Sequence, residues 1–231
     1  MNLSTKYSAC LKGELLCPGD KSISQRALII GSYLNQESII SNILSSSDPI
    51  YTANALNQVN ANLIFNKLSN TVKITRRQIP FQDPEDPLDL GNSGTGARLL
   101  AGFLSGLGIN ATITGDKSLS SRPMKRIVEP LTKMGFKLSS NNHRLPIEII
   151  QSHGGSFFEY NSPISSAQVK SSILLAALTG SIETKITEPI GSRDHTERML
   201  KHFGADIHSE TQNDKNICLL YTSPSPRDSS P

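Results

Sequence analysis

The sequence is poor in aromatic residues and in cysteine. It contains no Trp, and aromatic residues make up only 5% of its 231 positions, which predicts a core of mainly aliphatic side chains. Its three cysteines, Cys10, Cys17 and Cys218, form no CxxC pair and match no metal-ligand spacing. We therefore expect neither a disulfide framework nor a metal site. The length is sufficient for one large domain or two small ones with a buried core.

Long apolar runs and blocks of like charge are also missing. The longest apolar run, Ile173–Leu178, is far shorter than the roughly 20 residues that cross a bilayer. The polar start, Met1–Tyr7, lacks the apolar region of a signal peptide, so we expect a cytoplasmic protein without a membrane partner. The 23 basic and 20 acidic residues are scattered and give a net charge of +3, which disfavours binding to nucleic acid.

The C-terminal residues differ in composition from the rest. From Ile217 onward Ser and Pro replace the periodic apolar pattern, and no helix or internal strand tolerates that density of proline. We therefore predict that residues 217–231 are a tail outside the fold. The stretch Cys218–Asp228 resembles the translation of a transposon-end sequencing adapter, an interpretation that we favour over a native disordered tail. On this interpretation the native chain continues differently after residue 216.

Three similar segments organise the remaining sequence. They read KSISQRALII from residue 21, SGTGARLLAG from residue 93 and SSAQVKSSIL from residue 165. Their basic residues, Arg26, Arg98 and Lys170, are 72 positions apart each time, and each follows a small residue by four positions. Such spacing indicates an internal structural repeat.

Each repeat predicts the same order of elements. A helical pattern follows each motif, and then come a short β-type run, a second helical pattern and further strands. We predict an α/β (α+β) fold of three β-α-β-α-β-β units, each with two helices against a mixed sheet. The predicted boundaries are an N-terminal segment at 1–20 and units at about 21–90, 91–160 and 161–216.

Small polar residues and a basic side chain stand at the start of the first helix in each repeat. The free N–H groups and the positive end of the helix dipole favour phosphate or carboxylate there. At the first helix, Lys21, Ser22 and Arg26 are spaced to hold one anion with two cations and a hydroxyl. The alternative is an ordinary helix cap with solvated basic side chains, including Lys170 on the surface.

Four motifs then indicate a family. PGDKSIS-x-R, LGNSGTGAR, ITGDKSLSSRPM and SSAQVKSS occur in this order. Together they resemble the 5-enolpyruvylshikimate-3-phosphate (EPSP) synthase family over residues 11–207, and AQVK and RDHTE are most similar to its bacterial class II branch. That family has two lobes of three repeats in an inside-out α/β barrel. The resemblance implies that this sequence corresponds to the N-terminal lobe, with residues 1–20 partly packed against the second lobe.

The resemblance also implies an activity. The family transfers the enolpyruvyl group of phosphoenolpyruvate to the 5-hydroxyl of shikimate 3-phosphate and releases phosphate, a shikimate-pathway step toward chorismate and the aromatic amino acids. Its members are usually monomeric and need no metal or organic cofactor. The family's acidic base lies in the second lobe, so we expect this polypeptide alone to be inactive. Glyphosate-tolerant class II relatives carry Ala at the position of Gly94, so the intact enzyme is expected to be a glyphosate target.

Residue roles follow from the same resemblance. Lys21 is the catalytic residue that it assigns to this chain, in contact with both substrates. The residues implied for shikimate 3-phosphate are Lys21, Ser22, Arg26, Ser165, Ser166, Ala167, Gln168 and Arg193. Those implied for phosphoenolpyruvate are Lys21, Asn92, Gly94, Thr95, Arg98, Arg122 and Gln168.

Two alternatives remain open at this point. The related UDP-N-acetylglucosamine enolpyruvyl transferases share the repeat but use a loop cysteine and a different Lys-Asn motif. The pair Lys21-Ser22 and the run GDKSLSSRP argue against them. The second alternative is a half-lobe that binds phosphorylated metabolites without turnover.

Overall fold

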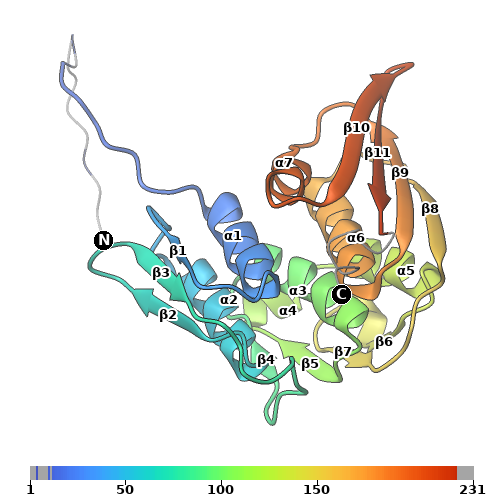
Figure 1. The fold of residues 1–231 in the computed structure, drawn as a ribbon, viewed down its shortest axis with the longest axis horizontal. Helices are drawn as coiled ribbons and strands as arrows, with labels where there is room; N and C mark the ends of the chain where they lie inside the picture. Colours follow the sequence, from blue (N-terminus) through green and yellow to red (C-terminus); the bar gives the residue numbers. More distant parts are fainter. Residues whose placement is uncertain (1–3, 5–9, 11, 223–231) are drawn as a thin grey trace, which may run out of the picture.

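The computed structural model describes residues 4, 10 and 12–222, and its centre is a group of three helices (Figure 1). These are α1 (Lys21–Tyr33), α3 (Gly94–Leu107) and α6 (Ala167–Gly180), the first helix of each repeat. Helix α3 contacts both α1 and α6. Gly102 and Gly106 permit the close crossing of α3 and α6, because a Cβ at either position would lie within 2.3 Å of a backbone oxygen of α6.

The remaining elements surround these helices in sequence order. The first unit continues with β1 (Ser38–Ile40), α2 (Ser47–Gln58), β2 (Leu63–Asn66) and β3 (Thr71–Ile74). The second comprises β4 (Leu88–Asp89), α3, β5 (Ala111–Thr114), the short α4 (Lys117–Ser120), α5 (Lys125–Lys133), β6 (Lys137–Ser140), a 3-10 turn (Asn141–His143) and β7 (Ile147–Ile150). The third comprises β8 (Phe157–Asn161), α6, β9 (Glu183–Pro189), α7 (His195–His202), β10 (Asp206–Gln212) and β11 (Lys215–Tyr221).

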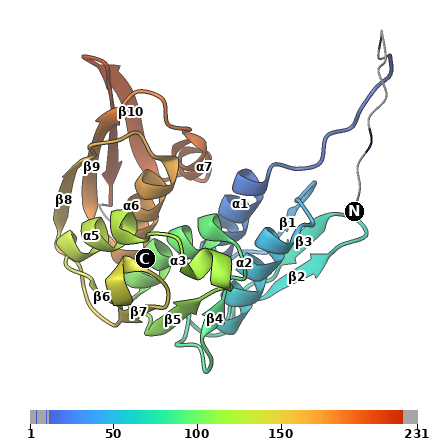
Figure 2. The same cartoon turned by 180° about the vertical axis from the view of Figure 1, so that it is seen from behind.

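Each unit contributes one mixed or antiparallel sheet on the outside of the helices (Figures 1 and 2). The strand orders are β1-β3-β2, β4-β5-β7-β6 and β10-β11-β9-β8. In the second and third sheets the opening strand pairs in parallel with the strand after the central helix, β4 with β5 and β8 with β9. The last two strands of every unit form an antiparallel hairpin.

The predicted unit order is present in full in the second and third units, and the first unit shows it without an opening strand among the described residues. The residues described before α1 form no strand, so the first sheet has three strands. The predicted unit boundaries also move, because β4 starts at Leu88 and β8 at Phe157, before residues 91 and 161. Opening strands lie a few residues ahead of the motifs from which the repeat was defined.

The predicted tail also begins too early. Strand β11 extends to Tyr221, between β9 and β10, and buries Cys218 and Leu220. The apolar residues of ICLLY alternate well enough to form a central strand before the prolines begin. The tail outside the fold therefore starts no earlier than residue 222, and residues 223–231 lie outside the described part. The proposed adapter origin of Cys218–Asp228 stays a prediction.

The thiol of Cys218 offers a direct test of β11. Burial raises the pKa of Cys218 to about 12, so almost no thiolate is present at neutral pH. We expect iodoacetamide to alkylate the exposed Cys17 rapidly in the native chain and to leave Cys218 unmodified until the chain is unfolded. Mass spectrometry of the digested protein measures both sites in one sample. Equal native labelling of Cys17 and Cys218 would show that β11 does not form.

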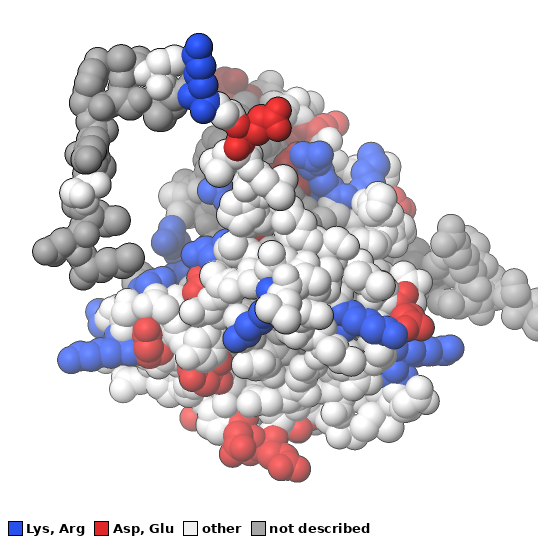
Figure 3. All heavy atoms as spheres, turned by 90° about the vertical axis from the view of Figure 1, so that its left-hand side faces the viewer, with Lys and Arg blue, Asp and Glu red and all other residues white. Residues whose placement is uncertain are grey.

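Basic and acidic side chains occur together on the side of the molecule shown in Figure 3. Within residues 4, 10 and 12–222, no helix has both the length and the apolar character needed to cross a membrane.

Candidate anion-binding site

The start of each central helix is capped by a side chain that the motifs supply. Asp20 accepts from the amide of Ile23 at 2.8 Å, and Ser93 accepts from the amide of Gly96 at 3.1 Å. At the third helix Ser166 accepts from the amide of Val169 at 3.5 Å. Each cap satisfies one of the free N–H groups of a first turn and leaves others available to a ligand.

Buried polar side chains hold the first helix start against the second. Gln25 of α1 is fully buried, and its Nε2 donates to Oγ of Ser93 and, at 3.0 Å, to Oγ1 of Thr52. Ser93 is the cap of α3, so this one amide connects the first turn of α1 to the entrance of α3. Because a buried donor without its partner is costly, the contact fixes the spacing of the two helix starts.

Arg26 connects the first helix to the third unit. Its Nε donates to Oγ1 of Thr196 at 2.7 Å, and its Nη2 donates to Oγ of Ser171 at 2.7 Å. Its Nη1 donates to the carbonyl and hydroxyl oxygens of Ser22. Only 2% of Arg26 is exposed, and burial lowers its pKa. In this structure Arg26 holds Ser22 and the third unit in place; its implied direct contact with substrate stays a prediction.

A third contact connects the second helix start to the third. Nε2 of Gln168, in the first turn of α6, donates to Oγ1 of Thr95 in the first turn of α3 at 2.9 Å. With the contacts of Gln25 and Arg26, it joins all three helix starts. The structure thus brings together most of the predicted site residues, which come from three repeats.

Arginine side chains converge above the start of α3. Nη1 of Arg98 donates to the carbonyl of Gly94 at 3.0 Å, and Arg122 donates to Oδ1 of Asn92. A Cβ at Gly94 would lie 2.8 Å from Nη1 of Arg98 and 3.0 Å from Nη1 of Arg122. Burial lowers the pKa of Arg98, and the charges of Arg126 and Arg122 lower it further. An anion bound here would relieve this repulsion.

Lys21 is a solvent-exposed cation at the start of α1. Half of its side chain is exposed, and its Nζ lies 2.9 Å from Oδ2 of Asp48. Asn92 is held in a similar way, because its Nδ2 donates to Oδ2 of Asp116 at 2.9 Å. The two carboxylates hold these polar groups in place, and the half-exposed ammonium of Lys21 remains accessible to a ligand.

The start of α6 combines hydroxyls with a cation. Ser165 and Arg193 are both exposed, and Arg193 lies near enough to Arg26 to contribute to the lowering of its pKa. The amide of Ser166 donates to Oε2 of Glu188 at 3.2 Å. Ser165, Ser166 and Ala167 therefore stand at one helix start, where a carboxylate already accepts from one amide, and the contact of these residues and Arg193 with a 3-phosphate stays a prediction.

The structure corrects the position of Lys170. The alternative that places it on the surface is wrong, because only 4% of the side chain is exposed. Its Nζ lies 2.7 Å from Glu188 and 2.5 Å from Glu197, both also buried. Burial by itself lowers the pKa of Lys170, but the two carboxylates outweigh it and raise the pKa above its ordinary value. Lys170 is a buried structural cation beneath the site.

Sequence reasoning misses several residues that support the site. They are Gln25, Ser171, Thr196, Glu188, Glu197 and Arg126. Gln25 and Ser171 lie inside the repeated motifs, next to Arg26 and Lys170, and this adjacency was the available signal. Across the part of the chain that the structure describes, no group of three or more His, Cys, Asp or Glu could hold a metal ion.

Comparisons with known proteins agree with this geometry. Residues 6–222 match the family model described as EPSP synthase (3-phosphoshikimate 1-carboxyvinyltransferase). A curated relative of that name from Petrotoga mobilis is 47% identical over 209 residues, 90% of this chain and 48% of the relative. One from Coxiella burnetii is 42% identical, over 95% of this chain and 50% of the relative.

A solved structure also matches. The EPSP synthase from Acinetobacter baumannii superposes with a TM-score of 0.79 at 36% identity, covering 91% of this chain and 47% of that one. The chain thus spans about half the length of the relatives that it matches.

Proposed function

The chain belongs to the EPSP synthase family, and we propose that it forms one lobe of a 3-phosphoshikimate 1-carboxyvinyltransferase. The proposed reaction adds the 5-hydroxyl oxygen of shikimate 3-phosphate to C2 of phosphoenolpyruvate while the methylene carbon takes up a proton. The 5-hydroxyl gives its proton to the base, and loss of inorganic phosphate together with a proton from the new methyl group then restores the double bond in the enolpyruvyl ether. We propose a cytoplasmic monomer whose partners are these two small molecules, with no metal or organic cofactor.

The observation that carries this proposal is the connection of three helix starts by Gln25, Arg26 and Gln168. Both substrates are multiply charged anions, and helix N-termini with adjacent cations bind such groups well. A site fixed before binding also loses less entropy when two reactants are brought together. The arrangement favours two anionic ligands side by side, one at α6 and one at α3.

Each ligand has a proposed set of contacts. The hydroxyls of Ser165 and Ser166, the Ala167 amide and Arg193 hold the 3-phosphate. Ser22 and the buried Arg26 hold the carboxylate and hydroxyls of the shikimate ring. Gln168 lies between the ligands, since it already contacts Thr95. Phosphoenolpyruvate lies against Gly94, where Arg98 and Arg122 converge, bordered by Asn92 and Thr95. Lys21 reaches both ligands from the start of α1 and stabilises the charge that develops as the enolpyruvyl group is transferred.

This lobe supplies anion contacts, and the proposed acidic base belongs to the family's other lobe. We therefore expect the chain alone to release no phosphate from the two substrates above the uncatalysed rate. A chimera that joins residues 1–222 to the second half of the Petrotoga mobilis relative is expected to release phosphate in proportion to added shikimate 3-phosphate. A colorimetric phosphate assay measures both proteins.

Matched controls define the outcome of this assay. The chimera with UDP-N-acetylglucosamine in place of shikimate 3-phosphate should release no phosphate. Turnover by the chain alone would overturn the assignment of the base to the other lobe. A folded chimera that accepts UDP-N-acetylglucosamine and rejects shikimate 3-phosphate would overturn the proposed function.

A further inference from the structure

Glu188 is a buried carboxylate near the end of β9, and it contacts two segments that are proposed to hold the 3-phosphate. Its Oε2 accepts from the amide of Ser166, the cap of α6, at 3.2 Å. Its Oε1 accepts from the hydroxyl of Ser192, the residue before Arg193. Only 2% of Glu188 is exposed. One side chain therefore connects the start of α6 to the loop of residues 190–193.

This loop passes close to the start of α6. A Cβ at Gly191 would lie 3.7 Å from Oγ of Ser165, so the loop backbone and the first of the two serines are neighbours. Arg193 belongs to the same loop. The spacing between the loop and the helix start therefore decides whether Arg193 and the serine hydroxyls can reach one phosphate group together.

The loop has little packing of its own. Ile190 is 52% exposed, and Gly191 and Arg193 are exposed as well. A cavity of about 280 Å³ lies between Ser192 and the hairpin of β10 and β11. The contact of Ser192 with Glu188 is therefore an important restraint on the position of the loop.

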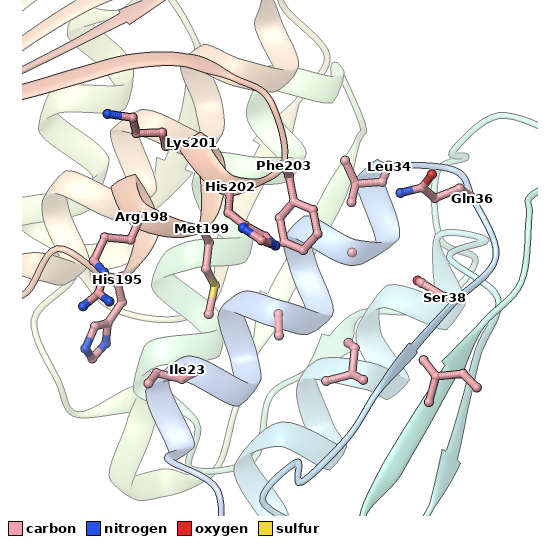
Figure 4. Close-up of a pocket in the computed structure, with 14 residues that line it drawn as sticks. Ile23, Leu34, Gln36, Ser38, His195, Arg198, Met199, Lys201, His202 and Phe203 are labelled. Carbon is pink, nitrogen blue, oxygen red and sulfur yellow. The ribbon is translucent and has the colours of Figure 1, made fainter.

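The end of the loop that enters α7 is fixed independently of Glu188. Oγ1 of Thr196, in the first turn of α7, accepts from Nε of Arg26 at 2.7 Å. Helix α7 also contacts α1, and His195 and Met199 line a groove together with Ile23 of α1 (Figure 4). Loss of the Glu188 contact would therefore release the loop while α7 stays in place on α1.

The negative charge of Glu188 is balanced by buried neighbours. Its Oε1 lies 2.7 Å from Nζ of Lys170, which in turn lies 2.5 Å from Glu197. Burial lowers the pKa of Arg26, and the charge of Glu197 acts in the opposite direction. Two cations and two carboxylates thus alternate beneath the site, so Glu188 can lie near a bound phosphate without the repulsion of an unpaired charge.

We propose that Glu188 is a positioning residue for the 3-phosphate, which holds the Ser192–Arg193 segment against the start of α6 before the ligand binds. It acts from behind the binding surface, through one amide and one hydroxyl. A loop that is already ordered loses less entropy when the phosphate binds, so the benefit falls on the phosphorylated ligand alone. This role rests on the proposed function, since it presupposes a 3-phosphate at α6.

Titration calorimetry of the chain with shikimate 3-phosphate and with shikimate tests this role. Glu188→Gln keeps the shape of the side chain and removes its charge and one of its two acceptor oxygens. We expect this variant to bind shikimate 3-phosphate about tenfold more weakly and shikimate, which lacks the phosphate, with less than about a twofold change. The ratio of the two dissociation constants is the readout, because a general loss of packing would weaken both ligands.

Glu197→Gln is the matched control. Like Glu188→Gln, it leaves Lys170 with one carboxylate, so the buried charge is the same in both variants. Oε1 of Glu197 pairs with Lys170, and its Oε2 has no hydrogen-bond partner within the described structure. The ratio of dissociation constants should therefore stay within about twofold of the parent value.

Ser192→Ala tests the same contact without disturbing the buried charges. It removes the hydroxyl that Glu188 accepts from, and should reduce the preference for shikimate 3-phosphate by about threefold. The double variant with Glu188→Gln should lose no more than Glu188→Gln alone, because both changes break one contact. If Glu188→Gln does not fold in urea-denaturation controls, Ser192→Ala alone decides the outcome.

Four results would overturn the positioning role. A preference for shikimate 3-phosphate that survives in the folded variants would overturn this role alone. Tighter binding of shikimate 3-phosphate by Glu188→Gln would mean that the carboxylate competes with phosphate for the Ser166 amide. An equal loss of preference in Glu197→Gln would assign the effect to the whole charge cluster. A parent chain with no preference for shikimate 3-phosphate would overturn the proposed function together with this role.

Discussion

Replacement of Lys170 by Ala is expected to lower the free energy of unfolding by about 3–5 kcal/mol, because it leaves two buried carboxylates without their cation. Oε2 of Glu197 already has no hydrogen-bond partner within the described structure, so the local structure has little capacity to compensate. The raised pKa of Lys170 keeps the ammonium charged and its stabilising contribution complete at neutral pH. That contribution is lost only as the pH rises through the folded-state value. Urea denaturation at neutral pH measures the change.

Two further variants separate charge from packing. Lys170→Met retains most of the buried stem and should still lose several kcal/mol, because the carboxylates stay unpaired. Lys125→Ala on α5 removes an exposed lysine whose Nζ lies 3.4 Å from Glu129, and should change stability by less than about 1 kcal/mol. If Lys170→Met is as stable as the parent, the buried charge cluster does not stabilise this lobe.

Replacement of Arg122 by Gln should weaken phosphoenolpyruvate binding by about 10- to 100-fold, the equivalent of one hydrogen bond to a charged group. Arg122 converges with Arg98 on Gly94, so its loss removes a cation from the proposed phosphoenolpyruvate position. The apparent dissociation constant of phosphoenolpyruvate for the chimera, measured by calorimetry with shikimate 3-phosphate present, reports this change.

The effect of Arg122→Gln should be specific to phosphoenolpyruvate. Shikimate 3-phosphate binding should change by less than about threefold, since its phosphate is assigned to the start of α6, and Lys125→Gln should leave both ligands unaffected. Equal weakening of both ligands by Arg122→Gln would contradict the separate positions proposed for them.

The sequence predicts the central helices well because their information is local. The 72-residue spacing of Arg26, Arg98 and Lys170 identifies three equivalent helices, and Ser93 and Ser166 act as caps where the motifs place them. The family resemblance, which the comparisons confirm, then indicates that their starts form a common site. Periodicity, capping and short motifs are properties of neighbouring residues, so they can be recognised without a structure.

The errors occur where distant residues decide the outcome. From its sequence context Lys170 is expected to be solvated. The fold buries it against Glu188 of β9 and Glu197 of α7. The first sheet lacks an opening strand among the described residues, and Pro18 has no N–H to donate where its equivalents Leu90 and Ser162 donate, a relation that appears only once the three sheets are compared. The prolines that follow β11 made its residues resemble the start of a tail, although they pair between β9 and β10. Burial and sheet pairing arise from tertiary contacts, and single-sequence patterns do not report them.

Titration calorimetry of the chain with shikimate 3-phosphate tests the central claim most directly, because that claim is an anion site built from three helix starts. We expect saturable binding of one molecule per chain, with shikimate, which lacks the phosphate, bound at least about tenfold more weakly. Lys21→Gln should weaken the binding of shikimate 3-phosphate without unfolding the chain. Equal affinity for shikimate and shikimate 3-phosphate, or no saturable heat with either, would contradict the account.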